Sequence, residues 1–154
     1  MRVVVQRVKK SKVKVNDEVV SEIGKGILAL VGIEKWDTEE IVGWVANKIV
    51  NLRIFEDTEG KMNLSVKDIG GEILLVSQFT LAAYIKKGNR PSFSEAMEEE
   101  LAREYFDKFV SMVKNQYPSV KTGIFKAHME IELVNDGPVT IIIERYPRDI
   151  SLNN

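Results

Sequence analysis

The sequence predicts an α/β fold in which mixed, strongly curved β-sheets carry two main helices packed on one side. Runs of β-branched and apolar residues, typical of strands, gather toward both ends of the 154-residue chain. Two segments between them repeat apolar residues at helical spacing. Because strands and helices do not alternate strictly, a doubly wound parallel fold is disfavoured. The length fits a single domain over residues 1–154, with a loose tail over 145–154.

The first part of the chain is predicted to form three strands. β-Branched and partly alternating residues indicate a strand over 3–15. A turn at 16–18 leads to a returning strand over 19–23, which completes a hairpin. The continuous apolar run 27–33 is typical of a strand buried on both faces.

Two helices are predicted from periodicity and capping residues. The first spans about 38–53, with Asp37 as its N-cap and Glu40 completing a capping box. The second begins after Ser92 or Ser94 and has acidic residues at its start, as the helix dipole favours. Apolar residues recur at helical spacing along it, at Met97, Leu101, Tyr105, Phe109 and Met112.

Further strands flank the second helix. The residues 73–76 form another apolar run typical of a buried strand. After Pro118, which ends the second helix, two late strands are predicted over 130–134 and 139–144. The residues 135–138 between them are all turn-formers, so they predict a hairpin.

The composition excludes several classes of function. Lys plus Arg number 22 against 23 Asp plus Glu, so a nucleic-acid partner would have to be held by a local patch. The chain has no cysteine and one histidine, His128, which excludes thiol chemistry and disfavours a metal site. No apolar run approaches the length of a membrane span. We therefore expect a cytoplasmic protein with no cofactor, no metal and no membrane contact.

Polar residues appear where the strand over 73–76 ends. Alternation would place Gln78 and Thr80 on one face, and Ser77 and Phe79 on the other. Polar groups at the end of a buried strand can build a site on a rigid support. Equally, these side chains can satisfy backbone groups where the strand leaves the sheet.

Two groups of basic residues are candidate phosphate contacts. One lies on the first strand and comprises Arg7, Lys9, Lys10, Lys12 and Lys14. Lysines on a solvated edge strand explain that group equally well. The other group, Lys86, Lys87 and Arg90, is favoured because it follows the polar strand end directly.

Six sequence segments together resemble the D-aminoacyl-tRNA deacylases, also called D-tyrosyl-tRNA deacylases. The two most specific are Ser77-Gln78-Phe79-Thr80-Leu81 and Asn135-Asp136-Gly137-Pro138-Val139-Thr140. Residues 6–8, 60–64 and 90–93 also match, as do 122–125 with Ala127 and Met129. The likeness extends from Met1 to about Glu144 and implies a D-tyrosyl-tRNA-deacylase-like fold.

The resemblance implies an enzyme that hydrolyses the ester of D-aminoacyl-tRNA, and of glycine mischarged on tRNA-Ala. It implies a homodimer with active sites at the interface, where a cis Gly137-Pro138 from one subunit excludes L-amino acids in its partner. Ser77, Gln78, Phe79 and Thr80 are the expected catalytic residues, with Phe79 and Thr80 N–H groups stabilising an oxyanion.

Three alternatives stay open at the level of sequence. Thr80 could act as a nucleophile, although no base is evident beside it. The chain could be a non-catalytic RNA-binding module that uses the same pocket. It could also be a Ser/Thr-type hydrolase of small esters, for which His128 would be the one available imidazole.

Overall fold

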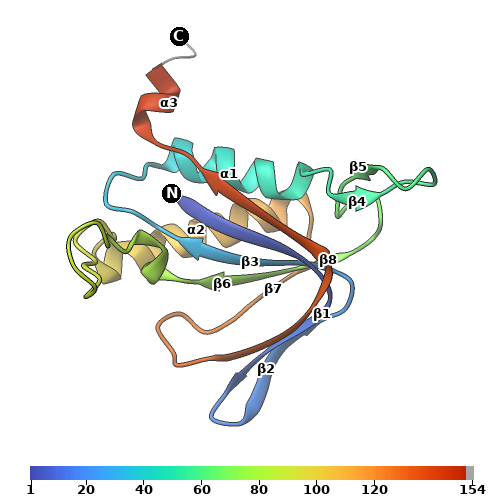
Figure 1. Cartoon of the computed structure of the whole chain (residues 1–154), viewed down its shortest axis with the longest axis horizontal. Coiled ribbons are helices and arrows are strands. Elements are labelled where there is room, and N and C mark those ends of the chain that lie inside the picture. The colour runs from blue at the N-terminus through green and yellow to red at the C-terminus, as the bar shows by residue number, and fades with distance from the viewer. Residues whose placement is uncertain (152–154) are drawn as a thin grey trace.

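The structure is a computed structural model that describes residues 1–151 (Figure 1). One sheet has the strand order β2-β1-β3-β6-β7, with β8 paired to β1, and a small second sheet joins β4 to β5. The elements in chain order are β1 (Arg2–Val15), β2 (Glu18–Ile23), β3 (Gly26–Gly32), α1 (Glu39–Asn51), β4 (Phe55–Glu56), β5 (Met62–Leu64), β6 (Glu72–Ser77), the 3-10 turn η1 (Phe79–Ala82), α2 (Glu99–Gln116), β7 (Val120–Thr122), β8 (Glu130–Glu144) and α3 (Pro147–Ser151).

The long strand β1 organises the curvature of the main sheet. Its first half, Arg2–Val8, pairs with β3, and its second half, Ser11–Val15, pairs with β2. Along its other edge β1 pairs with β8 over almost its whole length. The two strands bend together in Figure 1 and carry the β2 end of the sheet round toward β7. Ser21 of β2 donates a hydrogen bond to the Thr122 carbonyl there, so the sheet is nearly closed.

Strands β3 and β6 form the buried centre of the sheet, as their apolar runs predict. They pair in parallel, Gly26 opposite Glu72 and Val31 opposite Ser77. Side chains on one face of β6 join the core under the helices, and those on the other join a second core inside the curl of the sheet. The two strands approach so closely that a Cβ on Gly26 would lie 1.8 Å from the Glu72 carbonyl oxygen.

Helices α1 and α2 pack against each other on one side of the sheet, which confirms the predicted arrangement (Figure 1). Their predicted N-cap residues are wrong. Thr38, not Asp37, caps α1, since its hydroxyl accepts from the Ile41 N–H at 3.3 Å. Helix α2 begins several residues after Ser92 and Ser94 and is capped by the Glu98 carboxylate.

The predicted hairpin between two late strands is also wrong. Residues 130–144 are one strand, β8, which runs antiparallel to β1. Asn135 pairs with Val8 and Thr140 with Gln6, so the four residues 136–139 lie opposite Arg7 alone. The turn-forming residues therefore form a bulge within a strand instead of reversing the chain.

Several short elements lack a clear sequence signal. The loop expected after the first helix contains β4 and β5, and β7 follows α2. The tail expected to be loose forms the helix α3 over Pro147–Ser151, while residues 152–154 of that tail lie outside the described part. Within residues 1–151 no helix is long and apolar enough to cross a membrane.

Candidate active site

A polar turn follows the carboxyl end of β6. The strand ends at Ser77, and the chain then enters the 3-10 turn η1. The predicted strand alternation through Thr80 is therefore wrong beyond Ser77. The turn nevertheless brings Gln78 and Thr80 together, because the Gln78 side-chain amide donates a hydrogen bond to the Thr80 hydroxyl.

The backbone of this turn is fixed at its base and open at its tip. The Gln78 N–H donates to the Val31 carbonyl at 2.8 Å, which ties the turn to β3. No side chain caps η1, and the first N–H groups of a helical turn have no acceptor within it. Phe79 and Thr80, which carry the first two of these groups, are exposed. The turn thus presents backbone donors beside neutral polar side chains.

The hydrogen bonds of Thr80 do not include a general base. Among residues 1–151, the hydrogen-bond partner of its hydroxyl is the Gln78 amide, and no carboxylate or imidazole bonds to it. His128 lies exposed in the loop between β7 and β8 and forms no hydrogen bond within the described chain. A conventional Ser/Thr–His arrangement is therefore absent from the described residues.

The second sequence motif lies in the bulge of β8. Gly137 and Pro138 are exposed, and the peptide bond between them is cis. The buried guanidinium of Arg7 connects the bulge to the chain that follows α1. Its Nε donates to the Asp136 carbonyl at 2.9 Å, and its Nη1 donates to the Ile54 carbonyl at 2.8 Å.

The two motifs lie at opposite ends of the central strands. Gly26 of β3 pairs with Val8, which pairs with Asn135 at the edge of the bulge. Val31 of β3 pairs with Ser77 at the start of the polar turn. A strand rises about 3.3 Å per residue, so roughly 16 Å along β3 separates Gly26, which lies level with the bulge, from Val31, which lies level with the polar turn. One protomer does not bring Gly137 and Pro138 to Thr80.

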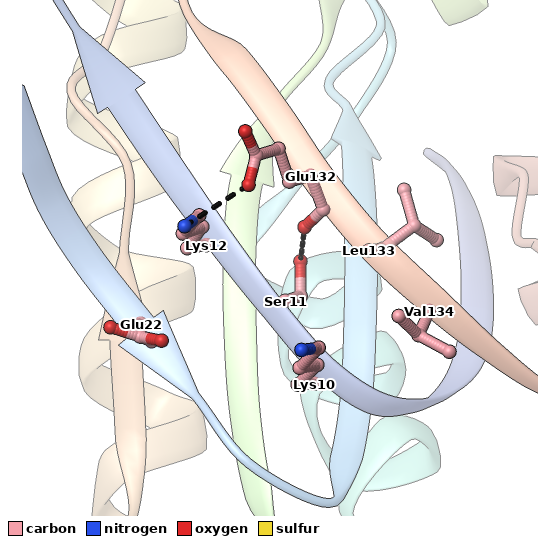
Figure 2. Close-up of a pocket in the computed structure, with 7 residues that line it drawn as sticks. All are labelled: Lys10, Ser11, Lys12, Glu22, Glu132, Leu133 and Val134. Carbon is pink, nitrogen blue, oxygen red and sulfur yellow. Dashed lines mark hydrogen bonds and ion pairs between the residues drawn. The ribbon is translucent and has the colours of Figure 1, made fainter. Parts of the chain in front are cut away.

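Of the first basic group, Arg7 is buried and Lys12 and Lys14 are neutralised, while Lys9 and Lys10 are exposed and form no ion pair within residues 1–151. Lys10 and Lys12 line a groove of about 240 Å³ with Glu132, which lies on β8 (Figure 2). Glu132 pairs with Lys12 at 3.1 Å and with Lys14 at 3.0 Å, and the hydrogen bonds from these two lysines lower the pKa of its carboxyl. Arg7 is only 6% exposed, so its prediction as a surface phosphate contact is wrong.

The second basic group lies on an exposed loop next to the polar turn. Backbone hydrogen bonds between Tyr84 and Ser92, at 2.8 and 3.1 Å, close the base of this loop. Lys86, Lys87 and Arg90 project from it, and none of them lies within ion-pair distance of a carboxylate in residues 1–151. These three cations are therefore available to an anionic partner.

Sequence reasoning missed two features beside the bulge. It placed Arg7 among surface cations, whereas the alternation of β1, with Val5 and Arg7 on one face, could have indicated burial. It also missed a cavity of about 490 Å³ beside the bulge, which depends on contacts far apart in sequence. The lining residues are Arg7, Lys9, Lys25, Phe55, Glu56 and Asp136.

Comparison with known proteins identifies the class. The family model described as D-Tyr-tRNA(Tyr) deacylase matches residues 4–144. The chain therefore belongs to the D-Tyr-tRNA(Tyr) deacylase family, and as such it is a hydrolase. This confirms the predicted family, fold class and enzyme class.

The individual relatives agree with the family model. The D-aminoacyl-tRNA deacylase of Carboxydothermus hydrogenoformans is 59% identical over 144 residues, covering 94% of this chain and 99% of the relative. The D-aminoacyl-tRNA deacylase of Thermoanaerobacter pseudethanolicus is 56% identical, and the match covers 94% of this chain and 97% of the relative. Among solved structures, the c-Myc DNA Unwinding Element Binding Protein matches with a TM-score of 0.90 at 44% identity. The match covers 94% of this chain and 99% of that protein. A probable eukaryotic D-amino acid tRNA deacylase matches with a TM-score of 0.80 at 18% identity, over 92% of this chain and 97% of that protein. This second likeness supports the fold alone.

Proposed function

We propose that this protein hydrolyses the ester that links a D-amino acid to the 3′ end of tRNA. The observation that carries the proposal is the exposed turn Gln78–Thr80, which presents backbone donors at the rigid end of β6 in a member of a deacylase family. Free D-amino acid and tRNA are the products. Glycine mischarged on tRNA-Ala is a further proposed substrate, because it lacks the side chain that would distinguish L from D.

The proposed chemistry requires no protein nucleophile. A water molecule attacks the ester carbonyl carbon, and the N–H groups of Phe79 and Thr80 stabilise the negative charge that develops on the carbonyl oxygen. The neighbouring hydroxyl of the terminal ribose assists in activating the water. The carbon–oxygen bond to the ribose then breaks, and the ribose oxygen takes up a proton. Gln78 and Ser77 orient the ester.

We propose that the active site is composite and lies between two copies of the chain. The roughly 16 Å that separate the levels of Ser77 and the β8 bulge along β3 support this, because one protomer cannot use both motifs at the same ester. A two-fold symmetric dimer would place the bulge of each subunit at the polar turn of its partner. Two equivalent sites would result.

In this arrangement Gly137 and Pro138 provide the chiral selection. An enzyme that accepts many D-amino acids cannot discriminate through a side-chain pocket, so it must recognise the α-carbon. A backbone segment placed where an L side chain would point excludes L substrates by steric clash. Both residues are exposed, and Arg7 holds the carbonyl of the preceding Asp136 in a fixed position.

The substrate is a tRNA, so the site also needs contacts to its phosphates. Lys86, Lys87 and Arg90 are proposed to bind phosphates of the tRNA acceptor end, since they lack carboxylate partners in the described residues and adjoin the polar turn. Because charged tRNA is used in the cytoplasm, we propose that the protein works there, without a cofactor.

The activity is tested by comparing three substrates: D-aminoacyl-tRNA, L-aminoacyl-tRNA and free D-amino acid esters. Hydrolysis of only the D-aminoacyl-tRNA is the expected result. Binding of tRNA without turnover would instead indicate an RNA-binding module. Comparable hydrolysis of the free esters would indicate a small-ester hydrolase, and comparable hydrolysis of L-aminoacyl-tRNA would exclude the proposed role of Gly137 and Pro138.

The composite site is tested by cross-linking, for which the absence of cysteine provides a clean background. Thr80→Cys and Asn135→Cys protomers are mixed and treated with a short bis-maleimide. A covalent dimer is expected only in the mixture, while each single variant serves as the control. Absence of the cross-link in a mixture that sediments as a dimer would contradict the proposed interface.

A further inference from the structure

An aromatic pair lies between the polar turn and the basic loop. Phe79 is 56% exposed and Phe93 is 37% exposed, although both are large apolar side chains. Their ring centroids lie 5.1 Å apart at an interplanar angle of 69°, so the pair packs edge to face. In an edge-to-face pair the rings do not cover each other, and aromatic surface is left open to solvent. The pair is therefore ordered and accessible.

The loop next to this pair carries positive charge. Phe79 immediately precedes Thr80, and Phe93 follows the loop Tyr84–Ser92, which carries Lys86, Lys87 and Arg90. In Figure 1 this loop projects from the end of the molecule where β6 ends and α2 begins. On β1, by contrast, Glu132 pairs with both Lys12 and Lys14. Within residues 1–151, the loop cations have no comparable carboxylate.

We propose that Phe79 and Phe93 form a stacking surface for an unpaired nucleobase of the tRNA 3′ end, the base that precedes the terminal adenosine. The three loop cations would bind the phosphates of the same strand. This inference rests on the proposed function and specifies how that site recognises its substrate. Exposed aromatic rings beside cations are the common means of binding single-stranded nucleic acid without regard to sequence.

A second copy of the chain is the less favoured occupant of this surface. A two-fold contact is formed by the same patch on both subunits. A second copy seated on this loop would bury Lys86, Lys87 and Arg90, which have no carboxylate in ion-pair contact within residues 1–151, so it would have to supply that carboxylate itself. A strand of nucleotides supplies both the ring faces and the negative charge that the surface lacks.

Stacking also suits an enzyme that serves many tRNAs. Every base has a flat face, so stacking tolerates sequence, and the unpaired 3′ end is common to all tRNAs. A base held on Phe79 would place the following ribose next to Thr80, because the two residues are adjacent in η1. The same contact would thereby help to position the ester.

The test uses a short RNA oligonucleotide with the sequence of the tRNA 3′ end, in which pyrrolo-cytosine replaces the base before the terminal adenosine. Its fluorescence should be quenched when the wild-type protein binds. Phe79→Leu and Phe93→Leu should weaken binding about 5- to 100-fold and reduce the quenching. Phe79→Tyr, which keeps a ring, should retain both. Ile85→Ala is the matched control, since Ile85 is 66% exposed on the same loop but cannot stack.

Two results would overturn the inference. One is binding by both leucine variants within twofold of wild type with the quenching intact. The other is a change from dimer to monomer in the sedimentation of both leucine variants, which would assign the surface to a second copy. Turnover of D-aminoacyl-tRNA is measured separately. Quenching by a wild-type protein that hydrolyses no D-aminoacyl-tRNA would refute the proposed function and leave the stacking intact.

Discussion

The guanidinium of Arg7 connects the β8 bulge to the core through the carbonyl of Asp136. Its Nε donates to that carbonyl at 2.9 Å, while its Nη1 donates to the Ile54 carbonyl at 2.8 Å. The Asp136 carboxylate lies 3.7 Å from the same Nε. One buried planar cation therefore fixes the backbone immediately before Gly137 relative to the chain that follows α1.

Replacement of Arg7 should release the bulge. Arg7→Lys keeps the charge but not the fork that reaches both carbonyls, so we expect the free energy of unfolding to fall by about 2–4 kcal/mol. The ratio of D- to L-aminoacyl-tRNA hydrolysis should fall at least about tenfold, because small displacements of a positioning group are costly. Urea denaturation and single-turnover rates measure the two effects.

Arg53→Lys is the matched control for this substitution. Arg53 also donates from Nε to a backbone carbonyl, that of Asn63 at 2.9 Å, but it is exposed. We expect a change in the free energy of unfolding below about 1 kcal/mol and an unchanged D-to-L ratio. A loss of stability in Arg7→Lys without any change in the ratio would restrict Arg7 to a structural role.

Removal of the Thr80 hydroxyl should leave hydrolysis largely intact. Thr80→Ala keeps the backbone N–H, which is the group proposed to stabilise the oxyanion, and loses a hydroxyl whose partner is the Gln78 amide. We expect a single-turnover rate within about tenfold of wild type, since the lost hydrogen bond only positions Gln78, which is proposed to orient the ester. Complete loss of hydrolysis, with an acyl-enzyme trapped on the wild-type protein, would make Thr80 the nucleophile.

The sequence predicted the elements whose signal is local. The apolar runs of β3 and β6 and the helical spacing of α1 and α2 each depend on neighbouring residues, and the structure confirms all four. The Asn135–Pro138 segment was misassigned because its turn-forming residues are locally ambiguous. What decides its structure is the pairing of Val8 with Asn135 and of Gln6 with Thr140, across more than 120 residues of chain.

In the candidate site, too, features with a local sequence signal were predicted, and features that depend on distant residues were not. The polar residues after β6 were identified from the sequence, because an abrupt change from apolar to polar is a local pattern. The hydrogen-bond partners of the Arg7 guanidinium and the pairing of Lys12 and Lys14 with Glu132 were not, since each depends on residues far away in the sequence. The aromatic contact between Phe79 and Phe93 likewise depends on the closure of the loop between them.

The basic loop should account for part of the salt dependence of tRNA binding. Each phosphate neutralised on a single strand contributes a slope of about −0.7 to log K against log salt. Replacing Lys86, Lys87 and Arg90 with Gln should therefore make the slope shallower by about 2, measured with uncharged tRNA. The double variant Lys12→Gln and Lys14→Gln is the control and should change the slope little, because Glu132 already neutralises these lysines. Equal effects in both variants would contradict the assignment.

Asp37, which the sequence assigned to a helix cap, should instead govern part of the pH dependence of stability. Asp37 is a buried residue, and its carboxylate accepts from the Glu34 N–H at 2.8 Å and pairs with the α-ammonium of Met1. Burial raises the pKa of Asp37, and the attraction of that ammonium only partly offsets the effect. The buried Glu34 carboxylate shares the same ammonium and adds repulsion. The folded state therefore holds the Asp37 proton more tightly than the unfolded chain does.

A raised pKa means that the stabilisation from protonated Asp37 is present below its unfolded pKa of about 4 and is lost as the pH rises through the folded pKa. Asp37→Asn keeps a neutral side chain of similar shape and removes this titration. We expect the free energy of unfolding of the wild type, relative to this variant, to decline as the pH rises from 4 to 7. Urea denaturation of both proteins at each pH measures the difference. A wild type that gains on the variant over this range would mean that the ion pair with the α-ammonium outweighs the cost of burying the carboxylate.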